Sequence, residues 1–272
     1  MYLLFDIGGT KMRLAVSRNG KHMGRPKIVP TPHDFDEGMR VIADIVSSLA
    51  GKGNITMAVG GVAGPLDAKK TRLANAPHLS GWIGKPLKKA LEKAAGTKKV
   101  HLENDAALSG LGEAHFGAGK GKAVVAYLTV STGVGGARIV NGRIDRNAMG
   151  FEPGQQIVHA GKSLEHYVSG SAMAARHHKK PHEIIDAEAW DEAARYLAHG
   201  VHNTIVHWSP DRVVVGGSVM LNSISLPKVI SYTKEIMRIF PELPEIKKAA
   251  LGDVGGLYGA LALLGQIKKA KK

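Results

Sequence analysis

The N-terminal stretch places a carboxylate, two glycines, a hydroxyl and an ammonium group between two apolar runs. The first run ends at Asp6, Gly8 and Gly9 follow, and Thr10 and Lys11 precede the second run. Glycines let backbone N–H groups approach a phosphate closely, and the hydroxyl and ammonium groups add donors. A carboxylate at a strand end can hold Mg²⁺, directly or through water. The pattern predicts two strands joined by a turn that binds a polyphosphate, with an ordinary Gly-Gly hairpin as the structural alternative.

Two later segments repeat the pattern of an apolar run followed by a glycine turn. Residues 124–140 form two apolar runs around a Thr132-Gly133 turn, and residues 212–218 form a short run that reaches Gly216-Gly217. The second segment suits a flat ring or a ribose against its backbone, because glycine leaves room there. Since each half of the chain offers a phosphate turn, we expect a nucleotide held between two similar lobes.

Asp105 is the candidate general base. It follows the predicted strand 100–103 and Asn104, and it precedes residues 106–115, whose apolar positions recur at helical spacing. A carboxylate between a strand and a helix is where α/β folds place groups that face a ligand. Asp105 could therefore accept the proton of a hydroxyl that attacks a γ-phosphoryl group. The structural alternative is that Asn104 or Asp105 caps the following helix.

Taken in order, these motifs resemble those of the ROK sugar kinases, within the actin, Hsp70 and hexokinase superfamily. The resemblance runs from residue 3 to about residue 264. The matching motifs are Asp6-Ile7-Gly8-Gly9-Thr10-Lys11, Gly61-Val62-Ala63-Gly64-Pro65, Glu103-Asn104-Asp105-Ala106, Ser131-Thr132-Gly133-Val134-Gly135-Gly136 and Gly216-Gly217. The resemblance implies ATP on the first and the last two motifs, the sugar beside Gly64 and Asn104, and Asp105 as the catalytic aspartate.

The resemblance adds three residues to the sugar site. Glu152 and Glu165 align with two glutamates that hydrogen-bond sugar hydroxyls, and Gln155 stands where most members have a zinc-ligating histidine. A carboxylate suits a vicinal diol because it accepts several hydrogen bonds, although a solvated loop glutamate is the alternative. The chain has no cysteine, which excludes the thiolate zinc site of most members. The change at Gln155 leaves the sugar preference open.

The resemblance also implies the fold, an α/β architecture of two actin/Hsp70/hexokinase-like (ribonuclease H-like) lobes with the active-site cleft between them. We expect the first lobe over residues 1–112, with a helix at 255–267 packing back on it, and the second lobe over 113–254. Residues 268–272 form a basic tail. Apolar spacing predicts a strand at 55–59 and helices at about 35–49, 188–207 and 218–240.

Composition and charge narrow the functional class. The 272 residues are 44% hydrophobic, which is enough for a full core. No run is long enough for a membrane span and Met1 leads directly into the first strand, so we expect no signal peptide and no membrane partner. The predicted ATP site argues for the cytoplasm. The formal net charge is +14, but the lysines are dispersed and aromatic residues are few, which argues against nucleic acid as the main partner. The charge would also suit inorganic polyphosphate as a donor.

These observations together predict an ATP- and Mg²⁺-dependent kinase that phosphorylates a hexose, glucose above all, on its primary hydroxyl. N-acetylmannosamine and fructose are alternative sugars, since residues 129–136 also resemble N-acetylmannosamine kinases. An alternative of another class is a catalytically silent sugar sensor, against which the intact Asp105 argues. The resemblance to this family also implies that the protein assembles as a homodimer.

Overall fold

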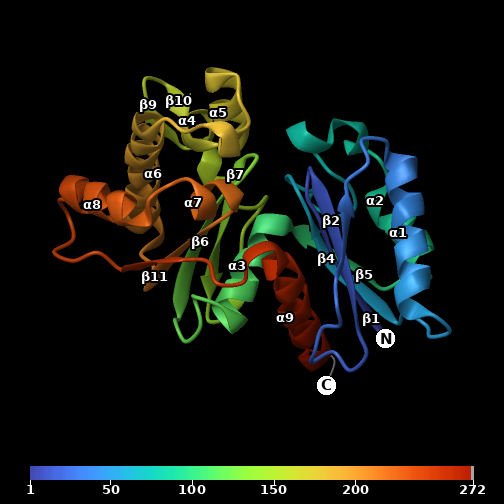
Figure 1. The fold of residues 1–272 in the computed structure, drawn as a ribbon. Coiled ribbons are helices and arrows are strands. Elements are labelled where there is room, and N and C mark those ends of the chain that lie inside the picture. The colour runs from blue at the N-terminus through green and yellow to red at the C-terminus, as the bar shows by residue number, and fades with distance from the viewer. Residues whose placement is uncertain (271–272) are drawn as a thin grey trace. The chain divides into compact units, whose positions relative to one another are not determined.

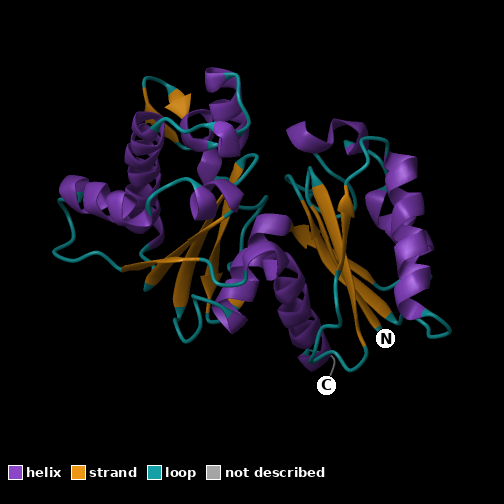
Figure 2. Cartoon of the chain, viewed as in Figure 1, coloured by secondary structure: helices purple, strands orange, loops and turns teal. Residues whose placement is uncertain are grey.

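The computed structural model describes residues 1–270 and divides the chain into two compact units. Unit 1 comprises Met1–Gly112, Arg146–Gly150 and the stretch from Val254 onward, and unit 2 comprises Glu113–Asp145 and Phe151–Asp253. Each unit contains a five-stranded sheet with helices packed against it (Figures 1 and 2). The predicted α/β class is therefore confirmed.

The sheet of unit 1 has the strand order β3-β2-β1-β4-β5. Its strands are β1 (Tyr2–Ile7), β2 (Lys11–Ser17), β3 (Lys27–Pro30), β4 (Met57–Val62) and β5 (Val100–Asn104). β1 pairs antiparallel with β2 and parallel with β4, which in turn pairs parallel with β5. The carboxyl ends of three parallel strands therefore meet at one edge of this sheet, near Asp6, Val62 and Asn104.

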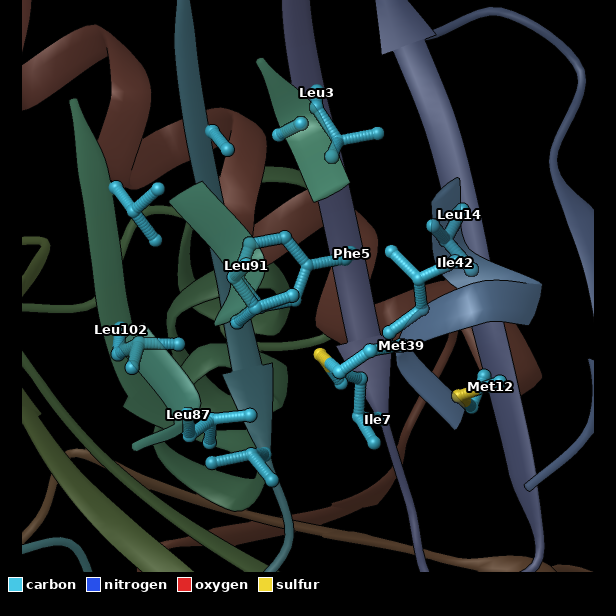
Figure 3. Close-up of a cluster of buried hydrophobic side chains, with 14 of the residues drawn as sticks. Leu3, Phe5, Ile7, Met12, Leu14, Met39, Ile42, Leu87, Leu91 and Leu102 are labelled. Atoms are coloured by element: carbon cyan, nitrogen blue, oxygen red, sulfur yellow. The ribbon is translucent and has the colours of Figure 1, made fainter. Parts of the chain in front are cut away.

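Helices cover both faces of this sheet. In Figure 1, α1 (Phe35–Ala50) and α2 (Leu87–Ala95) lie over one face, and α9 (Gly255–Lys269) lies over the other. Figure 3 shows the core under α1 and α2, which includes the fully buried Phe5 and Ile42. A short 3-10 helix, η1 (Pro77–Trp82), follows β4 in the chain. Apolar contacts on both faces thus hold the sheet in place, and the sheet in turn positions the polar residues at its carboxyl-end edge.

Unit 2 repeats this topology, with the strand order β12-β11-β6-β7-β8. Its strands are β6 (Val124–Val130), β7 (Val134–Val140), β8 (Arg143–Ile144), β11 (Arg212–Gly216) and β12 (Glu245–Lys248), beside a small hairpin of β9 (Ile157–His159) and β10 (Lys162–Ser163). Its helical segments are η2 (Pro153–Gln155), α4 (Leu164–Val168), α5 (Gly170–His177), η3 (Pro181–Glu183), α6 (Ala187–Trp208), α7 (Ser218–Asn222), α8 (Leu226–Ile236) and η4 (Gly252–Val254), whose last residue belongs to unit 1. As in unit 1, an antiparallel hairpin adjoins two parallel strands.

Three boundaries differ from the sequence prediction. The helix expected at 218–240 is two helices, α7 and α8, because Pro227 in the first turn of α8 cannot donate the hydrogen bond that a continuous helix needs. The strand expected at 55–59 begins at Met57 and runs to Val62. Lys268 and Lys269 belong to α9, so the predicted basic tail begins inside a helix, and its residues 271–272 lie outside the described residues.

One buried carboxylate secures the chain near two unit boundaries. Helix α3 (Asp105–Phe116) passes from unit 1 into unit 2 at Glu113, whose side chain is buried. Its Oε1 accepts hydrogen bonds from the backbone N–H groups of Ala250 (2.9 Å) and Leu251 (2.8 Å), and its Oε2 accepts one from Ala118 (2.7 Å). Three charge-assisted bonds satisfy the buried carboxylate. They tie α3 to the segment that leads into α9.

Candidate active site

The β1–β2 turn has the form that the sequence predicted. Its ends are joined by a hydrogen bond from the backbone N–H of Gly8 to the carbonyl oxygen of Lys11 (3.0 Å). Thr31, which follows β3, supports the turn with two hydrogen bonds. The Thr31 hydroxyl donates to the carbonyl oxygen of Gly8 (2.7 Å), and the Thr31 backbone N–H donates to the carbonyl oxygen of Thr10 (3.0 Å). A Cβ at Gly9 would lie 2.6 Å from the Cβ of His78, so η1 packs against the turn only because residue 9 is glycine.

Asp6 lies almost fully buried at the base of this turn. Its Oδ2 accepts a hydrogen bond from Nη1 of Arg13 at 3.3 Å, and the two residues face each other across the β1–β2 ladder. A Cβ at Gly256 would lie 2.7 Å from the Asp6 carboxyl carbon, so the first turn of α9 packs directly against this carboxylate. The positive end of the α9 dipole and the guanidinium of Arg13 therefore both lie next to the Asp6 carboxylate.

The donor set around Asp6 fits only one kind of magnesium site. Within residues 1–270, no three histidine, aspartate or glutamate side chains gather closely enough to enclose a metal ion. Mg²⁺ commonly binds through one or two carboxylates together with substrate phosphates and water. The residues present therefore fit a magnesium ion that arrives with a polyphosphate and meets Asp6, and they do not fit a cage made by the protein alone.

Asp105, Asn104 and Gly64 come together at the carboxyl-end edge of the same sheet. Oδ1 of Asn104 accepts from the backbone N–H of Ala107 (3.0 Å), and its Nδ2 donates to the carbonyl oxygen of Gly64 (3.3 Å). Asn104 thus caps α3, as the structural alternative predicted, and it also holds the Gly64 loop. A Cβ at Gly61 would lie 2.9 Å from the Cα of Asp105, so glycine at 61 lets the aspartate approach β4.

Burial is the largest influence on the ionisation of Asp105. Burial raises the pKa of the Asp105 carboxyl above its ordinary value, since burial disfavours the charged form. A hydrogen bond from the backbone N–H of Ala106 (2.8 Å) and the positive charge of Arg13 oppose this rise in pKa. A carboxyl with a raised pKa in a ligand-facing position is a candidate for general-base work.

Sequence reasoning missed two basic residues in unit 1. Arg13 stands seven positions after Asp6. A tight glycine hairpin pairs residues at that separation across its two strands, so the spacing in the sequence could have predicted the Asp6–Arg13 contact. Lys70 pairs with the carboxylate of Glu103, whose other oxygen accepts from the backbone N–H of Asn104 (3.1 Å). The Lys70–Glu103 contact joins a loop to a strand 33 residues later, and no sequence pattern indicates it.

In unit 2 the side chains of two predicted sugar residues, Gln155 and Glu165, contact each other, and the third, Glu152, adjoins them through its backbone. Nε2 of Gln155 donates to Oε1 of Glu165 (3.3 Å), and the backbone N–H of Val134 donates to its Oε2 (2.7 Å). The backbone N–H of Gln155 donates to the carbonyl oxygen of Glu152 (3.0 Å), which closes the η2 turn. Both oxygens of Glu165 are thus oriented by this chain before any ligand binds.

A cavity of about 410 Å³ lies beside the second phosphate motif. Its lining residues are Thr132, Gly170, Ser171, Ala174, Pro181, His182, Ser218, Val219, Asn222 and Ser223. The set is made of small, hydroxyl, amide and imidazole side chains, without a lysine, arginine or carboxylate among the described residues that line it. Such a lining suits an uncharged group that carries hydroxyls and a flat ring.

Backbone contacts hold the walls of this cavity together. The backbone N–H groups of Gly170 and Ser171 donate to the carbonyl oxygens of Ser131 (2.7 Å) and Thr132 (3.1 Å). Gly217 has φ +90°, and a Cβ there would lie 2.2 Å from the Val130 carbonyl oxygen. Gly217 therefore packs against the end of β6, just before the Thr132-Gly133 turn, and α5 contacts that turn without any sequence signal.

Comparison with known proteins finds relatives over nearly the same residues as the resemblance predicted from the sequence. A model of the ROK family matches residues 2–267. N-acetyl-D-glucosamine kinases are 29% identical in Citrobacter koseri and 30% identical in Escherichia coli O6:H1, each alignment covering 97% of this chain and 99% of the relative. Nearly the whole chain is therefore aligned with nearly the whole of these sugar kinases.

Solved structures share the fold over the same extent. A ROK hexokinase from Thermus thermophilus superposes with a TM-score of 0.83 at 28% identity, over 98% of this chain and 99% of that one. A ROK glucokinase from Streptomyces griseus, in complex with glucose and AMPPNP, gives 0.82 at 24% identity, over 97% and 99%. The expected two-lobed α/β fold is confirmed. Among residues 1–270, no helix has the length and apolar character that a membrane crossing requires.

Proposed function

Since the chain belongs to the ROK family and the curated relatives named above are sugar kinases, we propose that it transfers the γ-phosphoryl group of ATP to the primary hydroxyl of a hexose. The single observation that carries this proposal is Asp105. Its carboxyl stands between β5 and α3 with a raised pKa, beside the Asn104–Gly64 contact. This is the base that phosphoryl transfer to an alcohol needs.

The proposed reaction moves one proton and one phosphoryl group. Asp105 accepts the proton of the sugar hydroxyl while that oxygen forms a bond to the γ-phosphorus. The bond between this phosphorus and the β–γ bridging oxygen breaks, and ADP leaves with the electron pair. Asp105 later returns its proton to water. Positioning and charge neutralisation carry most of such a transfer, so the fixed direction of the carboxylate matters as much as its basicity.

We assign the sugar to residues of both units. Gly64, Asn104 and Asp105 in unit 1, and Glu152, Gln155 and Glu165 in unit 2, are the proposed contacts. The preset carboxylate of Glu165 would accept two hydrogen bonds from neighbouring hydroxyls at little entropic cost, because Gln155 and Val134 already fix it. These roles rest on the geometry within each unit and on the family resemblance.

We assign the nucleotide to three elements. The turn of Gly8, Gly9, Thr10 and Lys11 and the Thr132-Gly133 turn would hold phosphates, while the nucleoside would enter the cavity beside Gly216-Gly217. The uncharged lining of that cavity favours ATP over inorganic polyphosphate, which would need cations along its length. Magnesium carried by ATP would meet Asp6, where it would neutralise the charge of the phosphates.

The pH dependence of the rate should reflect the ionisation of the Asp105 carboxyl. The base must be ionised, so activity falls as the pH drops through its pKa, and burial places this fall at a higher pH than for an exposed aspartate. Removing the opposing positive charge in Arg13→Gln should raise that pKa further and shift the acidic limb of kcat/KM to higher pH. Arg13→Lys should shift it less. An acidic limb that stays in place in Arg13→Gln would contradict the assignment.

Glucose is the sugar that we propose first, and N-acetylglucosamine is the second candidate because the curated relatives above are named N-acetyl-D-glucosamine kinases. Gln155→Ala should change the preference between sugars by ~5-fold or more, since one amide hydrogen bond to a hydroxyl is worth about 1 kcal/mol and the freed Glu165 reorients. The measurement is kcat/KM for each sugar. Equal loss for every sugar would assign Gln155 to structure alone.

The test of the proposed function is ADP release from Mg-ATP with glucose, mannose, fructose, N-acetylglucosamine and N-acetylmannosamine, repeated with polyphosphate as donor and with product detection. We expect strong turnover with one sugar and with ATP. Folded protein that binds a sugar but turns over none would favour the silent sensor. The family also leads us to propose a cytoplasmic homodimer, which light scattering on the purified protein would test by its mass.

A further inference from the structure

Three rings of unit 2 pack together next to the proposed sugar residues. Tyr167 of α4 and Tyr196 of α6 stack with ring centroids 3.8 Å apart and planes inclined by 20°. The imidazole of His159, on β9, approaches both rings, with centroids 6.1 Å from Tyr167 and 5.8 Å from Tyr196. The stack thus joins three elements, α4, α6 and β9, of which α4 carries Glu165.

From this geometry we infer that the Tyr167–Tyr196 stack is a positioning device that sets the direction of Glu165 toward the sugar. The inference rests on the proposed function, because the sugar contact of Glu165 is part of it. Tyr167 and Tyr196 touch no substrate in this scheme. They act through the helix that carries the carboxylate.

Helix α4 cannot fix its own direction. It has five residues, a little more than one turn, and a helix of that length is not stable by itself in water. Its buried residue Leu164 packs so closely on α6 that a Cβ at Gly200 would lie 2.4 Å from Leu164 Cδ2. Val168, the other buried residue of α4, anchors its last turn in the core, and the Tyr167–Tyr196 stack adds a contact from the residue before it.

Tyr167 also ties the β9–β10 hairpin to α4. Its hydroxyl donates to the carbonyl oxygen of His159 at 3.2 Å, while the Leu164 N–H donates to the carbonyl oxygen of Gln156 at 2.9 Å. This hairpin is the chain segment between Gln155 and Glu165, which contact each other directly. Tyr167, held in the stack, therefore ties the hairpin that links Gln155 and Glu165 to the helix that carries Glu165.

A cation secures the end of α4 beyond the stack. Nη2 of Arg176, on α5, donates to the carbonyl oxygens of His166 (2.9 Å) and Tyr167 (3.3 Å). These carbonyls belong to the last turn of a short helix, where intrahelical partners are lacking. The docking of α4 is therefore completed by Arg176 from α5 and by two contacts with α6, one through Leu164 and one through the tyrosine rings.

The test separates sugar binding from nucleotide binding. Tyr196→Ala should raise the KM for the sugar by ~10-fold and leave the KM for ATP within ~2-fold, since a ring pair and its packing are lost on the sugar side alone. Tyr196→Phe keeps the stack and should behave as wild type. Tyr232→Ala is the matched control, because Tyr232 of α8 also packs on α6, where its ring lies against Arg195 and its hydroxyl donates to Asp191.

A second readout does not depend on catalysis. Hydrogen exchange in peptides spanning residues 157–169 should quicken in Tyr196→Ala and stay unchanged in Tyr232→Ala. Failure of the wild-type protein to phosphorylate any sugar would overturn the proposed function, whatever the exchange shows. An active Tyr196→Ala enzyme with unchanged sugar KM, or with sugar and ATP KM raised equally, would overturn the positioning role while leaving the kinase assignment intact.

Discussion

Asp105→Asn is expected to fold and to lose at least ~10²-fold in kcat, the loss that follows removal of a general base. Asparagine keeps the size of the side chain and an oxygen that can accept from the Ala106 N–H, so the start of α3 should persist. It cannot take up the hydroxyl proton. Asp105→Ala should lose at least as much. The measurement is ADP release at saturating sugar and ATP.

Binding assays supply the control for this variant. Calorimetry should find sugar and ATP bound by Asp105→Asn with affinities within ~10-fold of wild type, because the other proposed contacts remain. A thermal melt close to that of wild type would show that the fold persists. Near wild-type turnover in the folded variant would remove Asp105 from the role of base and with it the main support of the mechanism.

Ala174→Phe is expected to cost at least ~10²-fold in kcat/KM for ATP, or about 2.7 kcal/mol. Ala174 lines the cavity of about 410 Å³ in unit 2, and a phenyl ring there would occupy space that we assign to the nucleoside. The KM for the sugar should change little. Steady-state kinetics with ATP varied at saturating sugar measures the effect.

The neighbouring Ala175 offers a matched control on the same helix. It is exposed and does not line the cavity, so Ala175→Phe should keep the affinity for ATP. Polyphosphate, tested as the donor with both variants, separates nucleoside binding from phosphate binding, since it has no nucleoside to lose. An unchanged KM for ATP in Ala174→Phe would show that the nucleoside binds elsewhere.

Much of the site was predictable because its motifs are local. The β1–β2 turn, the Thr132-Gly133 turn and the junction at Asp105 each depend on neighbours within a few residues, where glycine freedom and strand-end carboxylates leave a clear pattern. The order of these motifs then predicted the fold, which the ROK match and the superposed structures confirm. The assignment of roles to the individual residues stays a prediction.

What sequence reasoning missed depends on contacts between distant segments. The stack of Tyr167 on Tyr196 joins residues that are far apart in the chain, and Glu113 binds backbone groups of residues 250 and 251. No spacing rule reports such pairs. The helix expected at 218–240 was wrong for another reason, because apolar spacing continued across a break that Pro227 imposes on the backbone.

The central claim, phosphorylation of a hexose by ATP, is tested most directly by ³¹P NMR of the purified protein with Mg-ATP and each sugar of the panel. The account predicts that one sugar yields ADP and a phosphate ester on the primary hydroxyl in equal amounts, and that Asp105→Asn yields neither at a comparable rate. Inorganic phosphate in place of a sugar ester, or no product with any sugar from folded protein, would contradict it.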